Sequence, residues 1–156
     1  MTVRNSSRAI VMNRNGDIFL FRFTFEWLNE ETLWITPGGG LEEGETFEEA
    51  LKRELYEELG LELGEDEYPL VFFRQKPFTM RNGGTLLSVE KYFLVRLDHA
   101  DFSFEHFSDD EKRLTTGHKW WSVEELKTSS EHFFAEELWK LVEMVSKDIP
   151  RQPVEI

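Results

Sequence analysis

Short apolar runs separated by polar stretches predict a domain that mixes strands with helices. Near the start of the chain, the apolar runs Ala9 to Met12 and Ile18 to Phe21 flank the pair Asn15-Gly16. An Asn-Gly pair between two such runs predicts two strands joined by a tight turn. Because both runs are nearly continuous, we expect both strands to be covered on both faces.

Three further strands follow from the same pattern. A short strand is expected around Leu33 to Thr36, and Pro37 with the three glycines behind it is expected to end any regular structure. Farther along, YPLVFFRQKPF and TLLSVEKYFLVRL predict two strands, and Arg81 to Gly84 between them predicts a hairpin turn. Strands and helices mixed in this way predict an α/β domain with helices on both sides of a sheet.

The C-terminal third is expected to hold one irregular segment, a strand and a long helix. The acidic stretch FSFEHFSDDEKRLTTGH is expected to be irregular, and KWWSVEEL predicts a short strand followed by a helical turn capped by Ser122. An amphipathic helix is predicted within SSEHFFAEELWKLVEMVSK, and RQPVEI is expected to be a loose tail. The inner face of that helix is predicted to carry Phe134, Leu138, Leu141, Val142 and Val145.

An earlier predicted helix is unusually rich in glutamate. Thr46 and Glu49 have the spacing of a capping box, and Gly60 is a good residue to end the helix. From Gly39 to Leu61 the chain packs eight glutamates into 23 residues. On a helical wheel, the apolar stripe consists of Phe47, Leu51 and Leu55.

Three of these glutamates share or border the apolar stripe. Glu58 lies between Phe47 and Leu51 in angle, Glu54 lies between Phe47 and Ala50, and Glu57 lies at the edge beside Ala50. Like charges at this spacing repel, and burying unpaired carboxylates costs several kcal/mol each. A divalent cation would relieve the cost, and so would protonation with a raised pKa. The alternative is that the side chains reach water near the helix end.

Composition narrows the range of partners. The chain of 156 residues carries 31 acidic and 18 basic side chains, a net charge of −13, and no cysteine. This acidity disfavours binding of a nucleic-acid polymer through charge alone, and the lack of cysteine excludes disulfides, thiol catalysis and zinc sites with sulfur ligands. No apolar run approaches the roughly 20 residues of a membrane span, and no signal peptide is recognisable. We therefore expect a cytoplasmic protein without a membrane partner.

The stretch from Gly39 to Leu61 resembles the signature of the Nudix hydrolase family, G-x5-E-x7-R-E-U-x-E-E-x-G-U, where U is a bulky aliphatic residue. The fixed positions are filled by Gly39, Glu45, Arg53, Glu54, Leu55, Glu57, Glu58, Gly60 and Leu61. The segments PGG, EKYFLV and GHKWWSVEEL extend the likeness over the rest of the chain. The resemblance implies a single Nudix domain over residues 1–156, folded as an α/β/α sandwich around a mixed β-sheet.

The resemblance also implies a hydrolase that uses Mg²⁺ or Mn²⁺ to cleave a nucleoside diphosphate linked to a further group. The implied metal ligands are Glu54, Glu57, Glu58 and the carbonyl of Gly38. The implied structural positions are Gly39, Gly60 and an ion pair between Glu45 and Arg53. A carboxylate must accept a proton from the attacking water, and the candidates are Glu57 or Glu54 in the signature, Glu111 in a distant loop, and Glu90 on a strand.

Contacts to the rest of the substrate must come from outside the signature. The candidates for phosphate contacts are Arg22, Arg74, Lys76 and Arg81, and those for stacking on a base are Phe25, Trp27, Phe78 and Phe107. Of these we single out Arg22, Arg74 and Phe78. For each candidate the alternative is an ordinary place at the surface or in the core.

The sequence thus predicts a pyrophosphohydrolase acting on a small nucleotide-type substrate such as an NTP or dNTP, ADP-ribose or a nucleotide sugar. The alternative is a catalytically silent nucleotide-sensing module of the same family. Such modules usually carry a broken signature, whereas this one is intact. A homodimer is a further expectation, because members of the family often dimerise.

Overall fold

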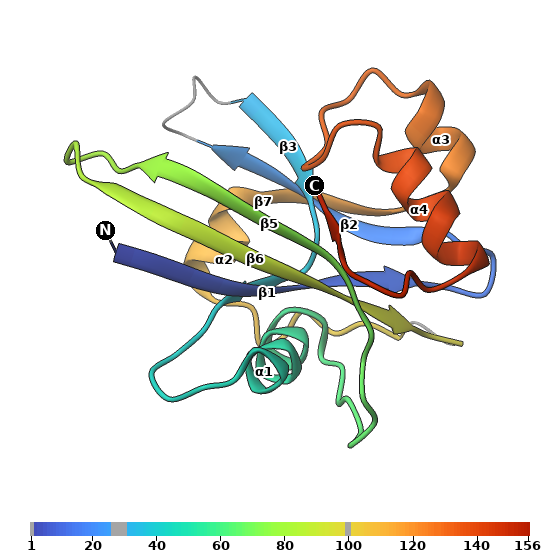
Figure 1. Ribbon diagram of the computed structural model, residues 1–156, viewed down its shortest axis with the longest axis horizontal. Coiled ribbons are helices and arrows are strands. Elements are labelled where there is room, and N and C mark those ends of the chain that lie inside the picture. Colours follow the sequence, from blue (N-terminus) through green and yellow to red (C-terminus); the bar gives the residue numbers. More distant parts are fainter. Residues whose placement is uncertain (1, 26–30, 99–100) are drawn as a thin grey trace.

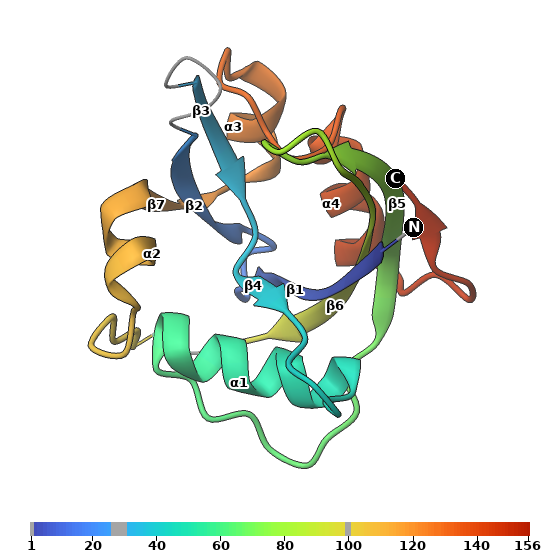
Figure 2. The same ribbon diagram turned by 90° about the vertical axis from the view of Figure 1, so that its left-hand side faces the viewer.

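The computed structural model describes residues 2–25, 31–98 and 101–156, and its strands form a curled sheet with helices on both faces (Figure 1). In chain order the elements are β1 (Thr2–Met12), β2 (Ile18–Phe25), β3 (Glu31–Ile35), β4 (Gly38–Gly40), α1 (Phe47–Leu59), β5 (Leu70–Thr79), β6 (Thr85–Arg96), α2 (Asp109–Leu114), β7 (Thr115–Trp121), α3 (Val123–Thr128), α4 (Leu138–Lys147) and β8 (Val154–Glu155). Figure 2 shows α1 along one side of the sheet and α3 and α4 on the other. The predicted α/β fold with helices on both sides is confirmed.

The sheet is mixed, and its order is β3-β2-β1-β6-β5-β8, with β4 paired to β1 and β7 paired to β2. β1 and β6 run parallel along their whole length, and β5 pairs with β6 antiparallel. β1 and β2 pair at Met12 and Ile18, beside the Asn15-Gly16 turn. Farther from the turn the two strands separate, because β4 takes the edge of β1 and β7 takes the edge of β2.

The strands β1 and β2 are covered on both faces, as their continuous apolar runs predicted. Ala9 and Val11 pack in the cluster that includes the buried leucines of α1. Ile10 and Met12 point the other way, into the cluster that contains residues of α3 and α4. Alternation along an extended strand therefore distributes one apolar run between two hydrophobic cores. Within the described residues, no helix is long and apolar enough to cross a membrane.

Two segments expected to be irregular are ordered. Gly38–Gly40 forms β4, because glycine lets its backbone come close to β1: a Cβ atom on Gly38 would lie 2.2 Å from the carbonyl oxygen of Ser7. Within the acidic stretch, α2 begins after Ser108, whose side chain forms a capping box with Glu111. That Ser-x-x-Glu spacing is readable in the sequence and would have predicted the helix.

Two predictions near the C-terminus need correction. α4 begins at Leu138, so Phe134 is buried in front of the helix rather than on it. The segment before α4 instead pairs with β3, where the Trp34 N–H donates to the His132 carbonyl and the Phe134 N–H donates to the Trp34 carbonyl. The expected loose tail contains β8, which pairs parallel to β5 at Phe72 and Phe73.

Candidate active site

α1 presents two buried carboxylates at one end of the sheet. The predicted capping box of Thr46 and Glu49 is present, and Gly60 ends the helix in a left-handed conformation. Glu54 and Glu58, four residues apart, are only 9% and 6% exposed. Burial raises the pKa of both carboxyl groups, and that of Glu58 lies well above its usual value.

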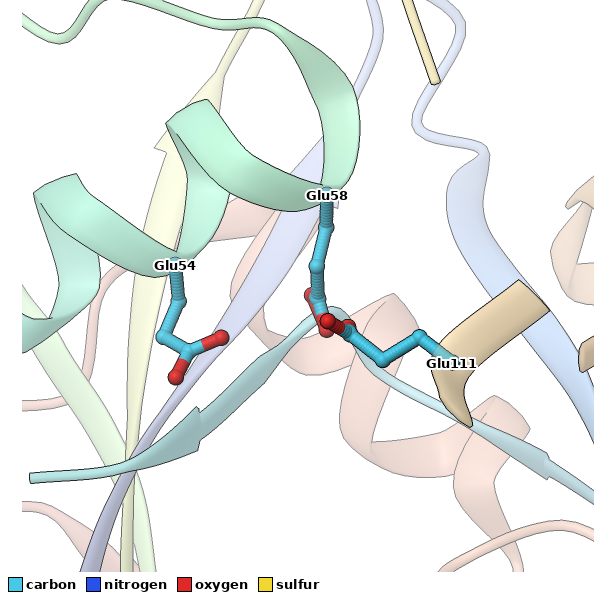
Figure 3. Close-up of side chains that lie close together, drawn as sticks. All are labelled: Glu54, Glu58 and Glu111. Carbon is cyan, nitrogen blue, oxygen red and sulfur yellow. The ribbon is translucent and has the colours of Figure 1, made fainter. Parts of the chain in front are cut away.

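A third carboxylate approaches this pair from a distant part of the chain. One carboxylate oxygen each from Glu54, Glu58 and Glu111 lie within 4.8 Å of one another. Glu111 reaches the pair from α2, on the side opposite α1 (Figure 3). Its backbone N–H donates to Ser108 Oγ over 3.1 Å, and its side chain accepts from the Ser108 N–H, so the helix cap helps to orient it.

These three carboxylates suit a hard divalent cation. Mg²⁺ and Mn²⁺ prefer oxygen ligands, and carboxylates that are mostly buried lack the water that would otherwise stabilise their charge. The observed convergence of three acidic groups, two of them buried with raised pKa values, is unfavourable unless a cation or protons neutralise them. The residues present therefore fit the predicted metal.

The glycines of β4 let the backbone meet these carboxylates. The N–H of Gly38 donates to Glu58 Oε2 over 2.7 Å, and the φ angle of Gly38 is 135°. A Cβ atom on Gly39 would lie 2.5 Å from Glu54 Oε1. Neither position accommodates a larger residue without displacing the carboxylate site or β1. Coordination by the Gly38 carbonyl remains a prediction.

The predicted ion pair between Arg53 and Glu45 is present and extends further than expected. The guanidinium donates to Glu45 over 2.7 and 2.9 Å, to the Gly40 carbonyl over 2.8 Å and to Glu54 over 3.0 Å. These bonds lower the pKa of Glu45 and raise that of Arg53. Glu57 also lies against Arg53, at 3.3 Å, and outside the cluster of three. Its assignment as ligand or base remains a prediction.

The candidate substrate residues occupy different settings. Arg74 is held inside the protein, donating to Glu90 and to the Tyr92 hydroxyl over 3.0 Å each and to the Phe134 carbonyl. Arg22 has a buried Nε with no hydrogen-bond partner among the described residues, so its role in substrate binding remains a prediction. Phe78 is 49% exposed.

The remaining candidates divide between surface and core. Lys76 and Arg81 are exposed, as a ligand contact requires, whereas Phe107 packs on Phe21 with ring centroids 5.2 Å apart. Phe25 lies 5.0 Å from the ring of Phe23, and Trp27 falls outside the described residues.

One residue near the cluster was not predicted. Arg8 interrupts the buried part of β1, and its guanidinium donates to the hydroxyl oxygen of Thr36 over 3.1 Å and also to the Thr36 carbonyl. Its charge partly offsets the effect of burial on the pKa of Glu58. A charged residue next to an apolar run was the available signal.

The sequence model of the family described as NUDIX domain matches residues 3–143. The chain belongs to the Nudix family. An RNA pyrophosphohydrolase from Helicobacter pylori (strain P12) is 38% identical over 102 residues, which cover 63% of this chain and 66% of that protein. The match therefore spans slightly less than two thirds of that relative's length.

Solved structures show the same fold. The ORF135 protein of E. coli superposes with a TM-score of 0.63 at 25% identity, over 94% of this chain and 91% of that chain. A MutT Nudix hydrolase from Burkholderia pseudomallei gives a TM-score of 0.62 at 20% identity, over 93% and 99% of the two chains, and shows the same fold. The signature residues of this Nudix protein thus lie in the architecture that the sequence predicted.

Proposed function

We propose that this Nudix protein is a pyrophosphohydrolase that requires Mg²⁺ or Mn²⁺ and cleaves the diphosphate of a nucleotide-type substrate. The observation that carries the proposal is the meeting of Glu54, Glu58 and Glu111 within 4.8 Å. A purely structural role does not explain why two elements far apart in the chain bring like charges together, at a cost in free energy. Membership of the Nudix family supports the same reaction.

Glu54 and Glu58 would hold the metal, with Glu57 and the Gly38 carbonyl as further predicted ligands. A bound divalent cation neutralises substrate charge, polarises the phosphorus–oxygen bond and makes water easier to deprotonate. We assign acceptance of the water proton to Glu111, because it faces the pair from a different element. Arg53 forms ion pairs with Glu45 and Glu54, and the pair with Glu45 fixes the loop before α1 against the helix.

The proposed substrate class is a nucleoside carrying at least two linked phosphates. The Helicobacter relative is named for RNA pyrophosphohydrolysis, so the class tested includes the phosphorylated 5′ end of RNA as well as small nucleotides. Including an RNA end among the substrates differs from the expectation, based on the net charge of the chain, that no nucleic-acid polymer binds. A cytoplasmic location and a homodimer remain predictions.

The test is incubation of the full chain with Mg²⁺ and a panel of (d)NTPs, ADP-ribose, nucleotide sugars and 5′-triphosphorylated RNA, with products separated by chromatography. Cleavage within the polyphosphate by the wild type, lost in Glu54→Gln, is the expected result. Glu111→Gln and Glu57→Gln run in parallel, and the larger fall in kcat identifies the proton acceptor. Binding without cleavage across the panel would instead favour the nucleotide-sensing module.

A further inference from the structure

Two rows of side chains cross the sheet beyond the candidate active site. The strand registers place the first row at Arg4, Ser88 and Lys76. The next row outward consists of Thr2, Leu86 and Phe78. Residues in register on neighbouring strands share a face of the sheet, as do residues two apart on one strand. We call these six residues the outer rows, and they all lie on one face of β1, β6 and β5.

This face is the one turned away from α1. Ser7 of β1 lies on the opposite face and donates to the Phe47 carbonyl at the start of α1, over 2.6 Å. Arg74 shares its face of β5 with Lys76 and contacts Phe134, which belongs to the core beside α4. Figure 1 shows this end of the sheet, where the start of β1 lies near the hairpin between β5 and β6.

The outer rows are basic and apolar, although the chain as a whole carries a net charge of −13. Arg4 and Lys76 are exposed, Phe78 is 49% exposed, and neither row contains an acidic residue. The exposed ring of Phe78 lies one row beyond the two cations, and an exposed aromatic side chain of this size leaves apolar surface in contact with water. The surface of the outer rows complements a ligand that combines negative charge with flat rings.

The outer rows adjoin the carboxylate cluster along β4. A Cβ atom on Gly40 would lie 3.6 Å from Nε of Arg4, and the neighbouring Gly39 lies against the carboxylate of Glu54. Arg8 lies on the same face of β1 as Arg4, and its guanidinium donates to the hydroxyl oxygen of Thr36 over 3.1 Å, just before β4. A ligand held at the cluster can therefore continue directly onto the outer rows.

We propose that the outer rows bind the single-stranded nucleic acid that follows a 5′-phosphorylated end held at the carboxylate cluster. This inference rests on the proposed function and extends it from the reacting phosphates to the polymer behind them. Arg4 and Lys76 contact backbone phosphates, and Phe78 stacks on a base. β1 and β5 lie two strand spacings apart, about 10 Å, which two long side chains can span. The positive charges of Arg4 and Lys76 then attract the nucleic acid locally, although the chain as a whole is negatively charged.

The experiment compares two substrates of the full-length protein. The values of kcat/KM are measured for ATP and for a short 5′-triphosphorylated single-stranded RNA, as a function of salt. We expect Phe78→Ala to lower the ratio of kcat/KM for RNA to that for ATP by roughly tenfold, the effect of one stacked base. Lys76→Glu should reduce the salt dependence of the RNA reaction, by about 0.7 in the log–log slope for each phosphate that the protein no longer neutralises.

Matched controls change the same properties elsewhere. Arg14→Glu makes the same change in charge at the other end of β1, where Arg14 pairs with Asp98 on the surface. Tyr56→Ala removes a ring that is 41% exposed on the outer side of α1. Both controls should leave the ratio unchanged. A ratio that falls equally in the controls, or in neither Phe78→Ala nor Lys76→Glu, overturns the proposal.

Direct binding separates this inference from the proposed function. Fluorescence anisotropy of a labelled RNA with a 5′-monophosphate measures the affinity of the protein for the RNA and does not require turnover. If the wild type cleaves nothing, the pyrophosphohydrolase proposal fails, and weaker RNA binding by Phe78→Ala and Lys76→Glu than by their controls still supports the surface. If all five proteins bind the RNA alike, the surface proposal fails even where cleavage is observed.

Discussion

Replacing Arg53 by methionine tests how strongly the site depends on its guanidinium. The change removes two bonds to Glu45, one to Glu54 and one to the Gly40 carbonyl, while keeping a long side chain with good helix propensity. The Arg53 side chain is 21% exposed and that of Glu45 is 12% exposed, so the pair resembles a buried ion pair more than a surface one.

Removing one partner of a buried ion pair costs roughly 3–5 kcal/mol, because the other charge stays buried. The remaining exposure of Arg53 places the expected loss at the lower end, about 3 kcal/mol. For a chain of this size each kcal/mol lowers the melting temperature by about 2–4 °C, so Tm should fall by about 6–12 °C.

The assay is calorimetric or fluorimetric unfolding in EDTA, with Lys52→Met as the control. Lys52 precedes Arg53 on α1 and lies on its outer side, so its replacement removes the same charge without touching Glu45. We expect the control to unfold within about 2 °C of the wild type, as surface changes usually do. An equal Tm for the two variants would refute the view that Arg53 braces the loop against the helix.

Three further predictions concern the carboxylate cluster. We expect Mg²⁺ to raise the Tm of the wild type, because it binds the folded state. Glu58→Gln should raise Tm in EDTA and abolish this response to Mg²⁺, because a neutral amide replaces a carboxylate that burial disfavours. The raised pKa of Glu58 means that the metal-free folded state binds its proton more tightly than the unfolded chain, whose reference value is 4.5. Proton binding by Glu58 therefore stabilises the metal-free fold fully below pH 4.5, and this stabilisation is lost as the pH rises toward neutral. The difference in Tm between Glu58→Gln and the wild type in EDTA should therefore grow between pH 5 and pH 7.5. A difference that stays constant over this range would contradict the raised pKa of Glu58. Gly39→Ala should remove the effect of Mg²⁺ on Tm, since its Cβ atom would lie 2.5 Å from Glu54 Oε1; an unchanged Mg²⁺ response in thermal unfolding would show that Glu54 is not needed for binding.

The elements that the sequence predicted well are those governed by local geometry. The helix from Thr46 to Gly60 has its cap, its end and its inward glutamates within a few turns, so a helical wheel contains the relevant information. The burial of Glu54 and Glu58 followed from their angle relative to the apolar stripe. The same holds for the hairpin between β5 and β6, whose turn and flanking strands are adjacent in the chain.

The tertiary structure alone decided which distant groups meet. Glu111 joins Glu58 because α2 packs near β7 and β2. The parallel register of β1 and β6 likewise places Arg4 in a row with Lys76. Such contacts depend on how the whole chain buries its apolar surface, and the residue spacing within a single segment does not predict them. The sequence by itself thus determined the chemistry of one helix and the family, whereas the fold determined the third carboxylate and the surface beside it.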